Sequence, residues 1–311
     1  MTKKPLIILT GPTAVGKTKA SIGLAKRIGG EIISADSMQV YRLMDIGSAK
    51  ITKEEMDGVT HHLIDILDPE EPFNIVMFQQ LAKKAMEEIY ERNHVPIIVG
   101  GTGFYIQSVL YDIDFASNDA DTSIRKELED YARENGPEKL HELLRQVDPE
   151  SADTIHFNNV KRVIRAIEYF RQTGEKISTH NEEERQKTSP YDSYYFVLND
   201  VRSHLYERID QRVDLMFSQG LLEEVKHLKD RGCSREMVSM QGLGYKEVLD
   251  YLDGRCSLEE AIYTIKRDTR HFAKRQLTWF KREKEVIWVE KDKFQYDEDQ
   301  ILDFIISKLN F

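Results

Sequence analysis

The feature that most constrains this chain is the segment Gly-Pro-Thr-Ala-Val-Gly-Lys-Thr, which follows the apolar run Leu6-Ile7-Ile8-Leu9 after a single threonine. It satisfies the pattern G-x-x-x-x-G-K-[ST] between a predicted strand and a predicted helix. Its two glycines let the backbone wrap closely, so successive N–H groups converge on phosphate oxygens at a helix N-terminus. The lysine adds a cation, and the last hydroxyl is placed to reach Mg²⁺. The sequence therefore predicts a site for a di- or triphosphate. Its residues are Gly11, Pro12, Thr13, Ala14, Val15, Gly16, Lys17 and Thr18.

Composition is that of an ordinary globular protein, with 311 residues, 40% of them hydrophobic and 32% charged. No apolar run approaches the ~20 residues that cross a bilayer, so no membrane association is expected. The N-terminus runs straight into the first predicted strand, which leaves no separate segment for a signal peptide. Two cysteines without metal-ligand spacing indicate neither a disulfide scaffold nor a zinc site. We therefore expect a cytoplasmic protein.

Hydrophobic patterning predicts strands at 5–10, 31–35 and 95–99, separated by helices at 16–28 and 74–92. Strands alternating with helices indicate βαβ units and a parallel sheet. In such sheets ligands bind at the carboxyl ends of the strands. The strand ends here are the phosphate loop, Asp36-Ser37-Met38-Gln39 and Gly100-Gly101-Thr102-Gly103. We expect the active site to be assembled from these three segments.

The pattern then changes. Residues 124–172 have helical periodicity without a strand signal, and polar stretches flank them. Strand character returns at 194–198 and again at 286–289, while helices fill most of 201–283. The predicted fold class is α/β: a P-loop NTPase-like parallel sheet flanked by helices, with an inserted all-helical subdomain. We expect the core at 1–117 and 194–311 and the insertion at 118–193.

Two clusters of basic residues, which we call the basic tracks, occur in a chain whose formal net charge is −10. Residues 266–283 hold seven Lys or Arg against two acids. On a helix, Arg267, Arg270 and Lys274 share one face, while Ile265, Gln276 and Phe280 lie on another that can pack on the core. A second cluster, Lys161, Arg162, Arg165 and Arg171, falls in the predicted insertion. Either track is compatible with a solvated helix, but the two together favour a polyanionic partner.

The strand at 95–99 lacks an acid at its end, where phosphoryl-transfer enzymes usually hold Mg²⁺. The acid beside the phosphate loop is instead Asp36, which can orient or deprotonate a nucleophile. His61 and His62 resemble a ligand pair, but neighbours on a strand cannot both face one metal. We interpret them as structural or pocket-lining.

Several further motifs occur in the order known from one family. They are Asp-Ser-Met-Gln-Val-Tyr (36–41), Met-Asp-Ile-Gly-Ser-Ala-Lys (44–50), His-His-Leu-Ile-Asp (61–65), Gly-Gly-Thr-Gly-Phe-Tyr (100–105), Gly-Leu-Gly-Tyr-Lys (242–246) and Lys-Arg-Gln-Leu-Thr-Trp-Phe (274–280). With the phosphate loop, the chain resembles the bacterial tRNA dimethylallyltransferases over residues 6 to about 282. That family prenylates N6 of adenosine 37, the residue 3′ of the anticodon, using dimethylallyl diphosphate. Val15 departs from the small polar residue of many members, and its side chain is expected to point away from the loop.

The resemblance implies roles for particular residues. Asp36, Thr13, Lys17 and Arg212 correspond to catalytic positions, and Mg²⁺ at Thr18 is the expected cofactor. The diphosphate then acts as a leaving group, which explains the missing strand-end acid. The positions expected to contact tRNA are Asp36, Ser37, Met38, Gln39, Thr102, Lys161, Arg162, Arg165, Gln241, Gly244, Tyr245, Lys246, Arg267, Arg270 and Lys274.

Three other functions stay open from the residues alone. A small-metabolite kinase would bind ATP and transfer phosphate without RNA. An adenylate isopentenyltransferase would use free AMP-type acceptors and would not need residues 266–283. A nucleotide-switched RNA-binding protein would make no product. The partners we expect are tRNA, through its anticodon stem-loop, and dimethylallyl diphosphate, with the protein acting as a monomer.

Overall fold

The computed structural model describes residues 3–115 and 123–310. It divides into two compact units, residues 1–110 with 190–311 and residues 111–189. The second unit begins and ends earlier than the insertion expected at 118–193. The residues around 112 belong with it because Lys187 Nζ donates to the Asp112 carbonyl at 3.4 Å. Asp192, in contrast, starts a strand of the sheet, where its N–H donates to the Lys4 carbonyl.

The first unit is built on a six-stranded, all-parallel sheet in the order β3-β2-β4-β1-β5-β6. The strands are β1 (Pro5–Thr10), β2 (Gly30–Ala35), β3 (His61–His62), β4 (Val95–Gly100), β5 (Asp192–Asn199) and β6 (Val286–Glu290). This architecture confirms the predicted α/β class. Patterning missed β3, which pairs only two residues with β2 at the edge of the sheet.

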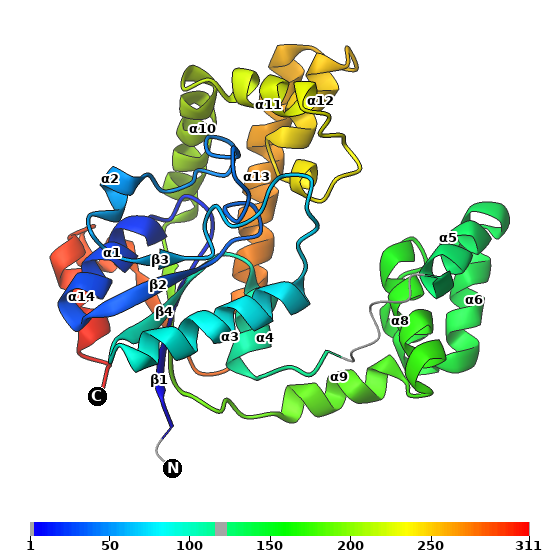
Figure 1. Cartoon of the computed structure of the whole chain (residues 1–311), viewed down its shortest axis with the longest axis horizontal. Helices are drawn as coiled ribbons and strands as arrows, with labels where there is room; N and C mark the ends of the chain where they lie inside the picture. The colour runs from blue at the N-terminus through cyan, green and yellow to red at the C-terminus, as the bar shows by residue number, and fades with distance from the viewer. Residues whose placement is uncertain (1–2, 116–122, 311) are drawn as a thin grey trace. The chain divides into compact units, whose positions relative to one another are not determined.

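Helices cover both faces of this sheet (Figure 1). Side chains alternate along β1, so Ile7 and Leu9 point to one face, where they share a core with α1 (Lys17–Ile28), α10 (Arg202–Ser218) and α14 (Glu298–Ile306). Leu6 and Ile8 point to the opposite face and are also fully buried. There α3 (Ile75–Glu91) packs against α4 (Gly103–Leu110) and the strands β2 and β4. A sheet buried on both faces explains the continuous apolar run of β1.

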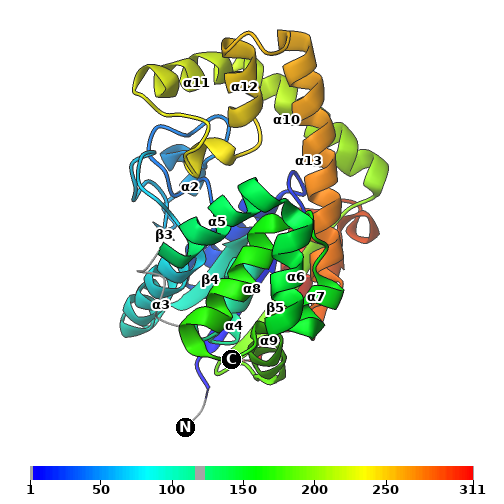
Figure 2. The same ribbon diagram turned by 90° about the vertical axis from the view of Figure 1, so that its right-hand side faces the viewer.

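Helices after β5 extend from the carboxyl end of the sheet. They are α11 (Leu221–Asp230), η1 (Ser239–Gln241), α12 (Tyr245–Leu252) and α13 (Leu258–Phe280), followed by η2 (Lys291–Phe294). In Figure 2, α11 and α12 lie side by side next to the long α13, and α10 also packs on α13. The short α2 (Lys53–Met56) has a capping box closed by Thr52 and Glu55. No helix in the described residues is long and apolar enough to cross a bilayer.

The second unit is helical: α5 (Ser123–Asn135), α6 (Pro137–Val147), α7 (Pro149–Thr154), α8 (Val160–Thr173) and α9 (Ile177–Gln186). Its core gathers Leu128, Leu140 and Leu144 with apolar residues of α8. A fully buried carboxylate, Asp148, accepts hydrogen bonds from the N–H and hydroxyl of both Ser151 and Ser178. One side chain thereby caps α7 and ties it to the start of α9. The unit's two ends are also joined, because the Asp114 N–H donates to Glu184 of α9.

Candidate active site

The phosphate loop lies between β1 and α1, as the sequence predicts. Gly11 has φ +150°, and a Cβ there would lie 2.4 Å from the Leu198 carbonyl oxygen of β5. No other residue fits this close approach of two backbones. Lys17 Nζ donates to the carbonyls of Gly11 and Pro12 at 3.0 and 2.9 Å, so its ammonium lies within the loop. The loop is therefore a formed cradle whose N–H groups belong to the N-terminus of α1.

Cations gather around this cradle. Burial and the nearby Arg212 charge lower the pKa of Lys17 to about 8, while Asp36 partly opposes the shift. Burial also lowers the pKa of Arg212, with a further contribution from the Arg208 charge. Arg208 and Arg212 are one helical turn apart on α10 and line the same cavity as Lys17. Several cations crowded together destabilise one another, so this region favours a multiply charged anion.

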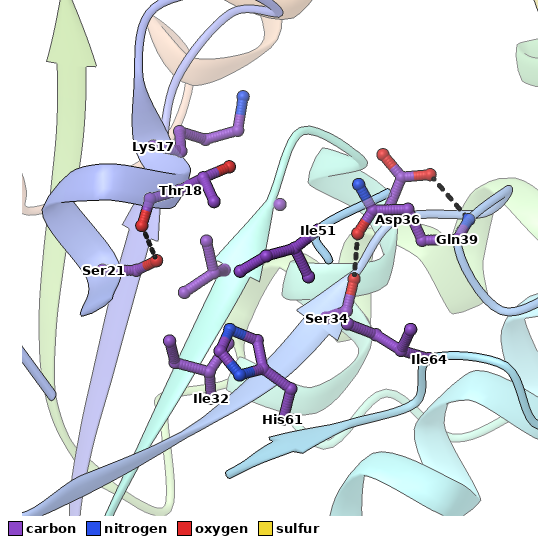
Figure 3. A pocket seen from close by; sticks show the side chains of 12 residues that line it. Lys17, Thr18, Ser21, Ile32, Ser34, Asp36, Gln39, Ile51, His61 and Ile64 are labelled. Atoms are coloured by element: carbon purple, nitrogen blue, oxygen red, sulfur yellow. Dashed lines mark hydrogen bonds between the residues drawn. The ribbon is translucent and has the colours of Figure 1, made fainter. Parts of the chain in front are cut away.

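Asp36 directly follows β2 and lies across a small cavity from Lys17 (Figure 3). Its Oδ1 accepts from the N–H groups of Met38 and Gln39 at 2.8 and 3.3 Å, which closes a turn and fixes the carboxylate. The turn does not use Oδ2. Gln39 is held by Ser34, at 3.2 Å, and by the carbonyls of Ser48 and Ala49. The side chain of Asp36 is thus oriented by its own loop.

Two cavities share this region. The smaller, about 60 Å³, lies between Lys17 and Asp36 and has apolar walls formed by Ile32, Ile51, Ile64 and Val99. The larger, about 710 Å³, also borders Lys17 and Asp36 and continues to α10. All three predicted strand-end segments contribute to the smaller cavity: the phosphate loop through Lys17, the second segment through Asp36 and the third through Gly100. The structure therefore brings together the segments that the parallel sheet predicted.

The two histidines do not form a metal pair. His62 Nε2 lies 2.7 Å from Glu31, whereas His61 lines the small cavity. Burial lowers the pKa of His61, which favours the neutral ring. The described residues contain no group of three or more His, Cys, Asp or Glu side chains that could hold a metal.

One wall of the larger cavity is the loop 44–50, and a residue missed in the sequence organises it. Glu224 of α11 accepts from the N–H groups of Asp45, Ile46 and Gly47 at 2.7–3.0 Å. The hydroxyl of Tyr245 also donates to Glu224, at 2.8 Å. The Tyr245 side chain is fully buried, so it does not offer the tRNA contact expected at this position and instead supports the loop through Glu224. No sequence signal distinguishes Glu224 from other helical acids.

Helix α13 reaches the phosphate loop through Gln276. Its Oε1 accepts from the Thr13 N–H at 2.9 Å, and its Nε2 donates to the Gly101 carbonyl at 3.0 Å. The sequence placed Gln276 only on a core-packing face. Its spacing from the apolar residues of α13 explains its burial, but nothing local reveals its two partners. Thr102, beside Gly101, is half-buried at the start of α4.

The other residues expected to contact tRNA are more dispersed. On α13, Arg267 pairs with Asp268, Arg270 pairs with Asp210 of α10, and Lys274 is exposed. Their charges are therefore partly neutralised within the chain. Gln241 is exposed and Lys246 is half-buried around α12, whereas Gly244 is buried. In the second unit, Lys161 and Arg162 are exposed on α8, and Arg165 pairs with Glu168.

Two further residues complete the description of this region. Val15 points from the loop into the core, where it is fully buried with Leu9 and Leu198. Arg208 was missed, although its i, i+4 spacing from Arg212 on a predicted helix is a usable signal.

Comparison with known proteins agrees with this architecture. The IPP transferase family model matches residues 39–283. A tRNA dimethylallyltransferase of Lachnoclostridium phytofermentans is 65% identical over 294 residues, covering 94% of each chain. The crystal structure of a tRNA isopentenylpyrophosphate transferase from Bacillus halodurans has a TM-score of 0.74 at 48% identity, covering 99% of this chain and 97% of that one. A eukaryotic dimethylallyltransferase, described as acting on tRNA, has a TM-score of 0.84 at 30% identity, covering 98% and 80%. The chain therefore belongs to the IPP transferase family.

Proposed function

We propose that this enzyme transfers the dimethylallyl group of dimethylallyl diphosphate to N6 of adenosine 37 in tRNA. The observation that carries the proposal is the position of Asp36 across a small, partly apolar cavity from Lys17 and the phosphate loop. A diphosphate cradle and a carboxylate on opposite walls suit an alkyl transfer in which diphosphate departs on one side and an amine arrives on the other. The β4 end, Gly100-Gly101-Thr102-Gly103, supplies no carboxylate of the kind that phosphoryl transfer uses.

The cationic side chains around the phosphate loop stabilise the leaving group. As the bond between C1 and the diphosphate oxygen breaks, negative charge grows on the diphosphate. Lys17, Arg208, Arg212 and the loop N–H groups are already in place to stabilise it, which is the main source of rate enhancement in such sites. The Thr13 hydroxyl, in the same loop, is placed to position the diphosphate or the amine.

Asp36 assists the attack of the nucleophile. The exocyclic adenine amine is a weak nucleophile because its lone pair is delocalised into the ring. As N6 bonds to C1, Asp36 accepts the N6 proton or its hydrogen bond, assistance worth about 10²–10⁴-fold. The target base must leave the anticodon-loop stack to enter this cavity. Gln39 lines both cavities, and Ser37, Met38 and Thr102, next to it or at the end of β4, are proposed to contact the base. The α12 and α13 residues described above are proposed to bind the RNA backbone, and those of α8 offer a further basic surface on the second unit.

Mg²⁺ fits the residues of this site. Mg²⁺ is usually held by one or two protein oxygens together with substrate phosphates and water, so a cluster of carboxylates is not required. The exposed Thr18 borders both cavities and offers its hydroxyl oxygen. The ion would supply further neutralisation of the diphosphate charge. We extend the proposal to a monomeric protein in the cytoplasm, where tRNA is modified, and light scattering with and without tRNA tests the oligomeric state.

The deciding experiment incubates the enzyme with dimethylallyl diphosphate labelled in its prenyl group, Mg²⁺ and unmodified tRNA. We expect label on RNA, at the adenosine 3′ of the anticodon, and release of diphosphate. ATP and free AMP serve as alternative substrates. Transfer of γ-phosphate from ATP, or prenylation of AMP in preference to tRNA, would contradict the proposal.

A further inference from the structure

The side chain of Gln276 joins the phosphate loop to the segment that follows the neighbouring strand β4. It accepts from the Thr13 N–H at 2.9 Å and donates to the Gly101 carbonyl at 3.0 Å. Only 6% of the residue is exposed, so its amide lies largely out of contact with water. Thr13 belongs to the loop after β1, and Gly101 follows the neighbouring strand β4. One amide group therefore fixes the spacing between two strand ends that form the site.

The fit around this amide is close. A Cβ at Gly101 would lie 2.1 Å from Gln276 Nε2, so glycine is required for the helix side chain to reach the carbonyl. A side chain at position 276 must accept a hydrogen bond from the Thr13 N–H and donate one to the Gly101 carbonyl. A carboxamide provides both, as does a protonated carboxylic acid. A carboxylate provides only acceptors and would face the Gly101 carbonyl with like partial charge.

The hydrogen bond also determines which loop N–H groups are available. Because the Thr13 N–H is used by Gln276 and the Val15 N–H donates to the Pro12 carbonyl at 3.4 Å, the loop N–H groups left for a diphosphate are those of Ala14 and of Gly16 onward. The same helix carries the exposed Lys274 two residues earlier, on the face expected to bind RNA. Gln276 thus places the loop that would hold the leaving group relative to the helix that would hold the acceptor.

On the basis of the proposed function, we propose that Gln276 is a positioning residue for prenyl transfer. It holds Thr13 and the β4–α4 junction at the spacing that aligns the diphosphate with the incoming amine. Gln276 touches no reacting atom in this role. Loss of the amide should misplace the phosphate loop by a fraction of an ångström to an ångström, and displacements of this size cost up to about 10²-fold in rate.

The test compares Gln276→Glu with Gln276→Leu across pH. At pH 8 both variants should lower kcat/KM for prenyl transfer by about 10–10²-fold. Affinity for tRNA, measured without the prenyl donor, should stay within about twofold of wild type, because no RNA-facing charge changes. The matched control, Gln80→Glu on the exposed face of α3, should behave as wild type.

Comparing the two variants at pH 8 and at pH 6 then distinguishes a positioning role of the Gln276 hydrogen bonds from a role in packing alone. Burial beside a carbonyl raises the pKa of a glutamate, and its protonated form restores both hydrogen bonds. The activity of Gln276→Glu relative to wild type should therefore rise at least about threefold, as its protonated fraction grows. The same ratio for Gln276→Leu should stay flat, because leucine does not titrate.

Three results would overturn the inference. The first is a Gln276→Glu ratio that does not change with pH, and the second is wild-type kcat/KM in Gln276→Leu. The third needs no variant: in the ligand-free wild type, the Thr13 amide should exchange slowly with deuterium because Gln276 protects it, and rapid exchange would contradict the hydrogen bond. Wild type that fails to prenylate tRNA would instead refute the proposed function.

Discussion

The phosphate loop and the wall facing it are built in different ways. The loop is eight consecutive residues whose geometry follows from two glycines and the start of α1. The facing wall is assembled from distant segments: Asp36 after β2, the loop 44–50 held by Glu224, and Gly101 held by Gln276. The comparison teaches that the backbone of the phosphate loop is encoded locally, whereas the α10 cations beside it, the Gln276 contact that positions it and the placement of the nucleophile all depend on tertiary contacts. Changes in the two regions should therefore have different signatures.

The largest effect is expected at Asp36. Asp36→Asn keeps an Oδ1 acceptor for the Met38 N–H, so the loop should hold its shape while the proton acceptor is lost. We expect turnover to fall by about 10²–10⁴-fold. Affinities for tRNA and for dimethylallyl diphosphate, measured separately by titration, should change little. Unaltered single-turnover rates in this variant would eliminate the base role.

A pH dependence of substrate binding should arise at the phosphate loop. The pKa of Lys17 is lowered to about 8 in the free enzyme, chiefly by burial, and a bound diphosphate raises it again. The charged form binds, so affinity for dimethylallyl diphosphate is full below pH 8 and falls above it, by up to about tenfold per pH unit. Calorimetric titration between pH 7 and 10 measures this slope. Lys17→Arg keeps its charge throughout and should lack that slope; an equal slope in this variant would assign the titration to another group.

A smaller effect should come from the basic face of α13. Changing Arg267, Arg270 and Lys274 together to glutamine should weaken tRNA binding and make its salt dependence shallower by roughly one unit per lost phosphate contact. Because Arg267 and Arg270 already pair with acids, we expect less than the full three units. A control that removes exposed lysines elsewhere, Lys84, Lys293 and Lys308, should leave the slope unchanged. If both triple variants have wild-type slopes, the RNA follows a different surface.

The smallest effect should come from Tyr245→Phe. The ring remains packed, and only the hydrogen bond to Glu224 is lost. We expect the free energy of unfolding to drop by about 1 kcal/mol, measured by denaturant titration. Since the backbone N–H groups of 45–47 still hold Glu224, turnover should change less than about threefold. A large loss of tRNA affinity would restore a direct RNA role for this tyrosine.

The sequence predicted those parts of the molecule that short-range rules decide. The strand-loop-helix at 5–28 and the other parallel strands follow from apolar runs and helical spacing, and Asp36 follows from where β2 ends. Gln276 and Glu224 could not be predicted, because each acts on backbone more than 170 residues away. The packing partners of Val15 could not be predicted for a related reason. Its orientation is set by packing against Leu198 of β5, and no local pattern records that contact.

The joined ends of the helical unit have one more consequence. Asp112 meets Lys187, and Asp114 meets Glu184, so the chain leaves this unit beside the place where it enters. A segment with such adjoining ends can be exchanged as a cassette. A short glycine-serine bridge in its place should leave the sheet able to fold, and grafting the cassette between relatives would show how much of the choice among tRNAs travels with it.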